Sequence, residues 1–122
     1  MSEQPITSKV IYNGNLRTTM IHQKSGQEIV TDAPTDNNGK GQAFSPTDLL
    51  ATSLASCMIT VMGIKANSMK INFSSAVAEV VKIMKSDPRS VSEIHINLQM
   101  PGHLDSTERS ILENTALNCP VA

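Results

Sequence analysis

The sequence of 122 residues is short of aromatic side chains, with one Tyr, two Phe and no Trp. A core must therefore be filled by Leu, Ile, Val, Met and Ala, and the length suits one domain. The net charge is −1 with both signs interspersed, and there is neither a basic patch nor an acidic tail. Nucleic-acid binding therefore has little support.

Cysteine is also scarce, because Cys57 and Cys119 are the only two. The first nine residues, MSEQPITSK, lack the apolar stretch of a secretory signal, so we expect a cytoplasmic protein. In that compartment two cysteines do not indicate a disulfide-stapled scaffold. They are too few for zinc unless a histidine helps, and His22, His95 and His103 are scattered. A zinc site of both cysteines and a histidine is the less favoured alternative.

Several familiar catalytic motifs are missing. The sequence has no GxGxxG, P-loop, GxSxG or HExxH pattern. The two cysteines are 62 positions apart, which excludes a thioredoxin-type CxxC motif. What chemistry the chain has must come from residues brought together by the fold.

The longest stretch without a turn signal runs from Ser45 to Ala66 and predicts one long helix. Ser45 suits the N-cap, and Asp48 three residues later suits a capping box. One apolar stripe at helical spacing predicts a buried face: Leu50, Leu54, Cys57, Val61 and Ile64. The uncharged run is too short and too rich in hydroxyls for a membrane span. We therefore expect a buried helix and no membrane partner.

Strand and turn patterns surround this helix. Before it, strands are predicted over 6–12, 16–23 and 27–31. The loop over 32–42 is either an active-site wall or an ordinary connection. After it, we expect one long strand over 69–84, either continuous or broken near Ser74-Ser75. A strand with one wet face over 91–100 and a helix over 105–118 follow. This order of elements indicates an α+β fold.

Cys57 lies near the middle of the predicted helix, where a thiolate is poorly stabilised. The helix N-terminus is about three turns away, and burial raises the pKa of a thiol. From spacing alone, two buried unreactive thiols are the more ordinary interpretation. A reactive Cys57 needs a cation, and Arg17 on the second predicted strand is the natural candidate. The alternative for Arg17 is an exposed strand arginine.

Four segments of the chain, taken together, resemble the OsmC/Ohr family of thiol peroxidases: YNGNLR, TDAP with DNNGKG, FSPTDLLATSLASCM and NTALNCPV. They occur in the family's order over nearly the whole chain, closest to the general OsmC-like branch. The resemblance implies one domain over 1–122, with antiparallel sheets around a long central cysteine helix. It also implies an intertwined homodimer with active sites at the subunit interface. The family pattern continues as a final strand beyond CPV, so we expect this chain to lack it.

The resemblance also implies roles for single residues. Cys57 matches the peroxidatic cysteine, Cys119 the resolving cysteine, and Arg17 the arginine that activates the thiolate. The family usually has a glutamate near the start of the cysteine helix to orient that arginine, and this sequence has Thr47 and Asp48 there. Asp48 either takes the glutamate's role with a shorter reach or merely caps the helix.

The carboxylate that holds Arg17 is left open by the sequence. The candidates are Asp48, Glu28, Asp32 or a residue of the second subunit. We include Asp48 with Cys57, Cys119 and Arg17 among the expected catalytic residues.

The reaction implied by the resemblance is hydroperoxide reduction in oxidative and osmotic stress defence. Attack of Cys57 on a peroxide leaves a sulfenic acid, which Cys119 captures as a disulfide. An external dithiol, lipoyl-type by resemblance, then restores both thiols. Organic hydroperoxides are the implied substrates, with no metal or organic cofactor. Two alternatives stay open: a binding module for a hydrophobic small molecule, and a redox sensor without turnover.

Overall fold

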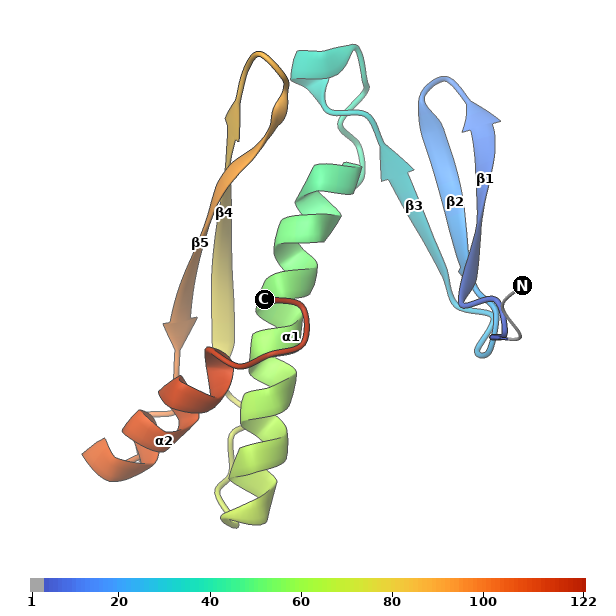
Figure 1. The fold of residues 1–122 in the computed structure, drawn as a ribbon. Helices are drawn as coiled ribbons and strands as arrows, with labels where there is room; N and C mark the ends of the chain where they lie inside the picture. Colours follow the sequence, from blue (N-terminus) through green and yellow to red (C-terminus); the bar gives the residue numbers. More distant parts are fainter. Residues whose placement is uncertain (1–3) are drawn as a thin grey trace. The chain divides into compact units, whose positions relative to one another are not determined.

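The computed structural model describes residues 4–122. The chain forms two compact units, Met1–Leu49 and Leu50–Ala122, and each is described by itself. Two antiparallel sheets and two α-helices confirm the predicted α+β class (Figure 1). The single domain over 1–122 stays a prediction.

The first unit contains a three-stranded antiparallel meander in the order β1-β2-β3. Its strands are β1 (Ser8–Gly14), β2 (Arg17–His22) and β3 (Glu28–Asp32). The β1–β2 turn places Asn15 and Leu16 at φ 57° and 63°, the left-handed conformations that a tight hairpin turn favours. The three predicted strands are confirmed, and the turn between the first two lies at Asn15-Leu16.

The loop after β3 folds back on the end of the sheet and contains a short 3-10 helix, η1 (Thr35–Asn37). The backbone N–H of Ala33 donates to the carbonyl of Leu16, and that of Asp32 donates to Phe44, both at 3.0 Å. Gly39 lies so close that an added Cβ would be 1.7 Å from the Ala33 carbonyl oxygen. Only glycine fits there, so the loop has a defined path against the sheet.

Helix α1 (Pro46–Ser68) begins where the sequence predicts. The Ser45 N–H donates to Asp48 Oδ2, and the Asp48 N–H donates to Ser45 Oγ, each at 3.0 Å. These two bonds satisfy donors that the first helical turn leaves free. The predicted capping box is confirmed.

The buried face of α1 is not the predicted one. In this chain Leu50 is 52% exposed and Ile64 is 65% exposed. The buried residues lie on a stripe roughly a third of a turn away: Ala51, Ala55, Met62 and Ala66. The prediction was wrong because apolar residues occur on most sides of this helix, so periodicity alone does not identify the side that the chain covers.

The second unit packs a hairpin and a short helix against α1. Its elements are β4 (Val77–Lys85), β5 (Ser90–Gln99) and α2 (Ser106–Ala116). Figure 1 shows α2 beside the C-terminal half of α1. Their shared core comprises Met62, Ala66, Ile71, Phe73, Leu104, Leu112 and Ala116. Along β5, half-buried apolar residues alternate with exposed polar ones from Ile94 to Gln99, as predicted.

The second helix confirms its predicted start. Asp105 is the N-cap of α2, and its Oδ1 accepts from the Glu108 N–H at 2.8 Å. The Glu108 side chain in turn accepts from the Asp105 N–H at 3.0 Å. The predicted capping pair is therefore a complete capping box.

The segment over 69–84 is interrupted by a turn at Ser74-Ser75, as the second alternative predicts, and only its last part forms a strand, because β4 begins at Val77. Lys70 adopts φ 57° after α1, and Asn72 Oδ1 accepts from the Ser74 N–H at 3.1 Å in a local turn. Between them, Ile71 and Phe73 enter the core. Their apolar character reflects core packing of an irregular segment rather than a strand.

By length and composition alone, α1 is apolar enough to cross a membrane. The core helix of a soluble protein meets the same criterion, and one such helix is weak evidence. In this chain Met62 and Ala66 of α1 pack in the core shared with α2. We therefore describe α1 as a core helix.

Candidate active site

Arg17 and Asp32 form an ion pair at one end of the first sheet. Arg17 begins β2, and its register partner on β3 is Asp32. Nε of Arg17 donates to Oδ1 of Asp32 at 2.7 Å, and Nη2 donates to Oδ2 at 2.8 Å. The Asp32 side chain is 2% exposed, while that of Arg17 is 38% exposed. Two parallel charge-assisted bonds fix the plane of the guanidinium as well as its position.

Gln42, in the loop before α1, contacts both members of the pair. Its backbone N–H donates to Asp32 Oδ2 at 3.1 Å. Its side-chain Oε1 accepts from Arg17 Nη2 at 3.4 Å, which is a longer and weaker bond. The loop over 32–42, predicted to be either a site wall or a connection, therefore contacts the candidate site through its last residue.

The electrostatics of the pair favour both charges. The pKa of Asp32 lies below its ordinary value of 3.8, first because of the hydrogen bond from Arg17, with burial opposing this. The Gln42 backbone bond and the positive charges of Arg17 and Lys40 lower it further. The hydrogen bond to Asp32 likewise raises the pKa of Arg17. Both groups therefore stay charged at neutral pH.

The structure gives Arg17 a partner that the sequence did not single out. Asp32 was one of four candidate partners for Arg17. The sequence feature that could have favoured it is its position at the end of the strand that follows the Arg17 strand. Glu28 pairs with Ile21 at the other end of β3. Asp48 accepts from the Ser45 N–H in the helix cap. The orienting role expected of Asp48 stays a prediction.

Both cysteines lie in the second unit as free thiols. Cys57 is half-buried on α1, on the stripe whose ends, at Leu50 and Ile64, are exposed in this chain. Cys119 follows α2 and is 5% exposed, so the chain covers it almost completely. Arg17 belongs to the first unit, so its predicted meeting with Cys57 stays a prediction. The structure thus brings together Arg17 and Asp32 in one unit, and it places the two thiols in the other.

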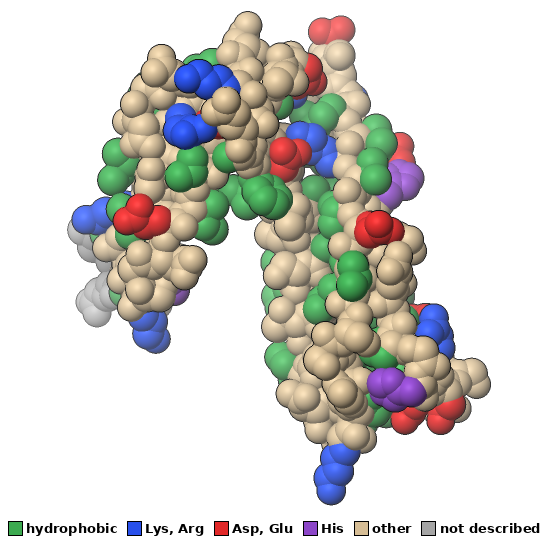
Figure 2. All heavy atoms as spheres, turned by 180° about the vertical axis from the view of Figure 1, so that it is seen from behind, with side chains coloured by type: hydrophobic (Ala, Val, Ile, Leu, Met, Phe, Trp, Pro, Cys, Tyr) green, Lys and Arg blue, Asp and Glu red, His purple; other side chains and the backbone are tan. Residues whose placement is uncertain are grey.

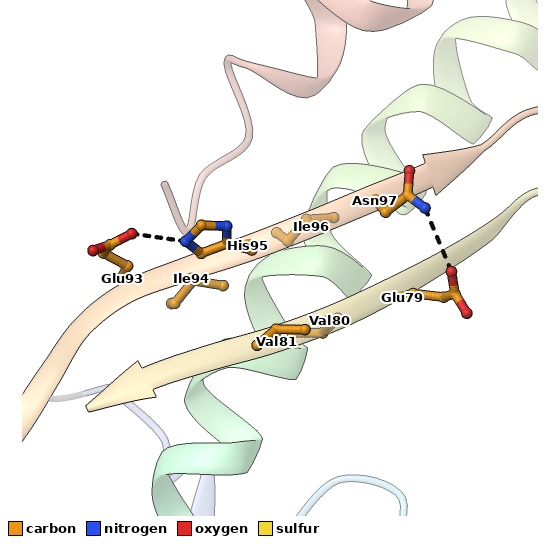
Figure 3. A pocket seen from close by; sticks show the side chains of 8 residues that line it. All are labelled: Glu79, Val80, Val81, Glu93, Ile94, His95, Ile96 and Asn97. Carbon is orange, nitrogen blue, oxygen red and sulfur yellow. Dashed lines mark hydrogen bonds and ion pairs between the residues drawn. The ribbon is translucent and has the colours of Figure 1, made fainter.

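A surface depression follows β4 and β5 (Figure 3). Polar side chains line part of it, with His95 Nε2 2.7 Å from Glu93 Oε1 and Asn97 Nδ2 3.4 Å from Glu79 Oε1. These are exposed pairs of the kind that usually contribute little. Neither cysteine lines the depression, so it offers no thiol chemistry.

The zinc alternative finds no geometric support in the described part of the chain. Among residues 4–122, no group of three or more His, Cys, Asp or Glu side chains is placed to hold a metal ion. The remaining candidate reactive groups in this part of the chain are the thiols of the second unit and Arg17 of the first unit.

Comparison with known proteins identifies the family. The family model described as OsmC-like protein matches residues 39–122. A solved structure from Psychrobacter arcticus 273-4, titled as a proposed osmotic stress induced and detoxification response protein, is 58% identical with a TM-score of 0.95. The match covers 99% of this chain and 88% of that chain. The chain belongs to the OsmC-like protein family.

More distant structures share the fold. An OsmC-like protein from Mycoplasma pneumoniae is 17% identical with a TM-score of 0.78, covering 98% of this chain and 86% of that one. An organic hydroperoxide resistance protein OsmC from Legionella pneumophila is 19% identical with a TM-score of 0.69, covering 99% and 88%. No curated protein sequence gives a significant match. The predicted family and fold are confirmed.

Proposed function

We propose that this protein is a cysteine-based peroxidase that reduces organic hydroperoxides in stress defence. The observation that carries the proposal is membership of the OsmC-like family in a chain that has both Cys57 and Cys119 as free thiols of one unit. The 58% identical relative, named for an osmotic stress and detoxification response, supports the same biological setting. We also propose a cytoplasmic location, because two cysteines are too few for a disulfide-rich secreted scaffold.

The proposed reaction begins with the thiolate of Cys57. It attacks the terminal oxygen of the hydroperoxide, the O–O bond breaks, and the departing alkoxide takes a proton to leave as an alcohol. The product is a sulfenic acid on Cys57, which the Cys119 thiol attacks to form a disulfide and release water. A dithiol reductant of the lipoyl type restores both thiols through a mixed disulfide and is itself oxidised to a disulfide. No metal or organic cofactor takes part.

Arg17 is the proposed activating residue. A guanidinium remains charged when partly buried, and a cation beside a thiol favours the thiolate. Arg17 is held as a charged, half-exposed side chain by a buried carboxylate, which suits this task. The proposal requires that Arg17 reach a Cys57 thiol, from its own chain or from a second copy.

We further propose that the protein works as a homodimer. Hydrophobic side chains are visible on the surface of both units (Figure 2). On α1 they include Leu50 and Ile64, and an added Cβ on Gly63 would meet nothing within 4 Å. An apolar helix face that its own chain leaves open is typical of a surface covered by another subunit.

Hydroperoxide consumption tests the proposed function. The assay supplies an organic hydroperoxide with dihydrolipoamide and compares wild type with the Cys57→Ser and Cys119→Ser variants. We expect turnover by the wild type, none by Cys57→Ser, and in Cys119→Ser a single round without sustained turnover. Equal hydroperoxide loss in wild type and Cys57→Ser would overturn the proposal. An apolar ligand that binds both proteins equally, without turnover, would favour a binding module instead.

A further inference from the structure

We propose that Asp32, which the backbone of Gln42 holds in place, is the positioning residue for Arg17. In this arrangement the Nη1 end of the guanidinium stays available to donate hydrogen bonds to a thiolate or a peroxide oxygen. This inference deepens the proposed function and rests on it for the identity of the group that Arg17 meets. It assigns to β3 and its loop a task for which the sequence offered only alternatives.

Asp32 and Gln42 occupy only part of the hydrogen-bonding capacity of Arg17. A guanidinium has five N–H donors in one plane. Asp32 takes those of Nε and one of Nη2, and Gln42 Oε1 is near the other of Nη2. Within residues 4–122, Nη1 has no recorded hydrogen-bond partner. Two donors at the outer end of the side chain are therefore free to meet a thiolate or a peroxide oxygen.

The side chains of Arg17 and Asp32 differ in their exposure to solvent. Asp32 is almost fully buried, whereas Arg17 keeps more than a third of its side chain exposed. A buried carboxylate in this arrangement acts as an anchor, and the exposed cation is the group presented outward.

Asp32 is itself held in place by hydrogen bonds to the loop that follows β3. The Asp32 N–H donates to the carbonyl of Phe44 at 3.0 Å, and its Oδ2 accepts from Gln42. Immediately before Arg17, Leu16 adopts φ 63°, an uncommon conformation for a bulky residue. Its carbonyl accepts from the Ala33 N–H at 3.0 Å. The residues flanking both charges are thus hydrogen-bonded to one another, which restricts the movement of Arg17 and Asp32.

Neutralising Asp32 should change the pKa of Cys57 in opposite directions, depending on the role that Asp32 has. As a mere negative charge, Asp32 would disfavour a nearby thiolate, so neutralising it would lower the pKa of Cys57. As the residue that positions Arg17, its loss would release the guanidinium and raise the pKa of Cys57. A purely structural role for Asp32 would leave the pKa of Cys57 in folded protein unchanged.

The experiment measures the pKa of Cys57 from the pH dependence of its alkylation by iodoacetamide. It uses the full chain with Cys119→Ser, so that one thiol remains. With Asp32→Asn added, we expect the pKa to rise by about one unit, which is about a tenfold loss of thiolate well below the pKa. Glu28→Gln is the matched control, because it removes the same charge from the same strand without touching Arg17. An unchanged or lowered pKa in Asp32→Asn overturns the proposal.

Two further variants keep the test decisive. If Asp32→Asn does not fold, Arg17→Lys takes its place, because a lysine keeps the positive charge but loses the two-point contact with Asp32. We expect a rise in the pKa of Cys57 in this variant as well, and no change would contradict the inference. Asp48→Asn should leave this pKa unaltered, and a rise equal to that of Asp32→Asn would return the positioning role to Asp48. The failure of the proposed function is seen separately, as absence of hydroperoxide consumption by the wild type, because alkylation requires no peroxide.

Discussion

At the scale of single residues, the candidate site contains an arginine that is both charged and held in place by a carboxylate. Asp32 both favours the charged form of Arg17 and fixes the orientation of its guanidinium, because it accepts two short hydrogen bonds from Nε and Nη2. A planar fork matched to a carboxylate cannot be reproduced by a lysine, whose ammonium is a single point charge. Charge and shape at position 17 can therefore be separated by substitution.

Arg17→Lys should retain the positive charge and lose the two-point contact with Asp32. We expect a fall of about tenfold or more in kcat/KM for an organic hydroperoxide, equivalent to ~1.4 kcal/mol of transition-state stabilisation. Steady-state kinetics with a dithiol reductant measures it, and Lys9→Arg, on the neighbouring strand, is the control. Full activity in Arg17→Lys would show that charge alone suffices.

The lowered pKa of Asp32 predicts how stability depends on pH. A carboxyl group whose pKa is lower in the folded protein stabilises the fold above its ordinary pKa of 3.8, and this contribution is lost as the pH falls through the folded value. Urea unfolding at a series of acidic pH values should therefore show a shallower loss of stability in Asp32→Asn than in wild type. Glu28→Gln should keep the wild-type slope, and parallel curves for all three proteins would contradict the assignment.

At the scale of elements, the loop between β3 and α1 connects the sheet to the cysteine helix and fixes the site. Its path depends on Gly39, where an added Cβ would meet backbone atoms of Ala33 rather than a movable side chain. The same loop then delivers the Gln42 N–H to Asp32. A disturbance of the loop should therefore be detected at Arg17.

Gly39→Ala tests this dependence. We expect a loss of ~1–3 kcal/mol in the free energy of unfolding, as for other substitutions that force atoms into filled space. Chemical denaturation measures it, and Gly102→Ala is the control because its added Cβ would meet nothing within 4 Å. If Gly39→Ala is as stable as wild type, the loop does not follow the described path.

Much of this arrangement could be predicted from the sequence, and the failures have physical causes. Local signals sufficed for the three strands of the first sheet, for the capping boxes at Ser45 and Asp105, and for the alternation on β5. They failed where tertiary packing decides, as at Phe73, which is a core residue on an irregular segment. The choice of Asp32 for Arg17 depends on strand register, which a single sequence left among several alternatives.

At the scale of the whole molecule, packing within one chain leaves a stripe of apolar residues on α1 partly exposed to solvent. Leu50, Cys57 and Ile64 lie on this stripe, outside the buried face of the helix. A second copy covering the stripe would shield the apolar side chains and lower the polarity around the thiol. The proposed homodimer and the proposed chemistry are therefore linked through α1.

Ile64→Glu should weaken the proposed dimer, because a carboxylate would be buried without a partner. We expect a shift from dimer to monomer at micromolar concentration, measured by size-exclusion chromatography with light scattering. Ser92→Glu, which adds the same charge at an exposed polar position of β5, should leave the dimer intact. A monomeric wild type, or a dimer unaffected by Ile64→Glu, would contradict the proposed interface.

The central claim is that Cys57 is oxidised by a hydroperoxide and Cys119 resolves the product. The most direct measurement adds one equivalent of an organic hydroperoxide to the Cys119→Ser variant in the presence of dimedone, followed by peptide mass spectrometry. We predict a dimedone adduct on Cys57 and one alcohol released per chain, because the sulfenic acid cannot pass to a disulfide. Wild type should instead give a Cys57–Cys119 disulfide. Intact hydroperoxide with an unmodified Cys57 thiol would contradict the account.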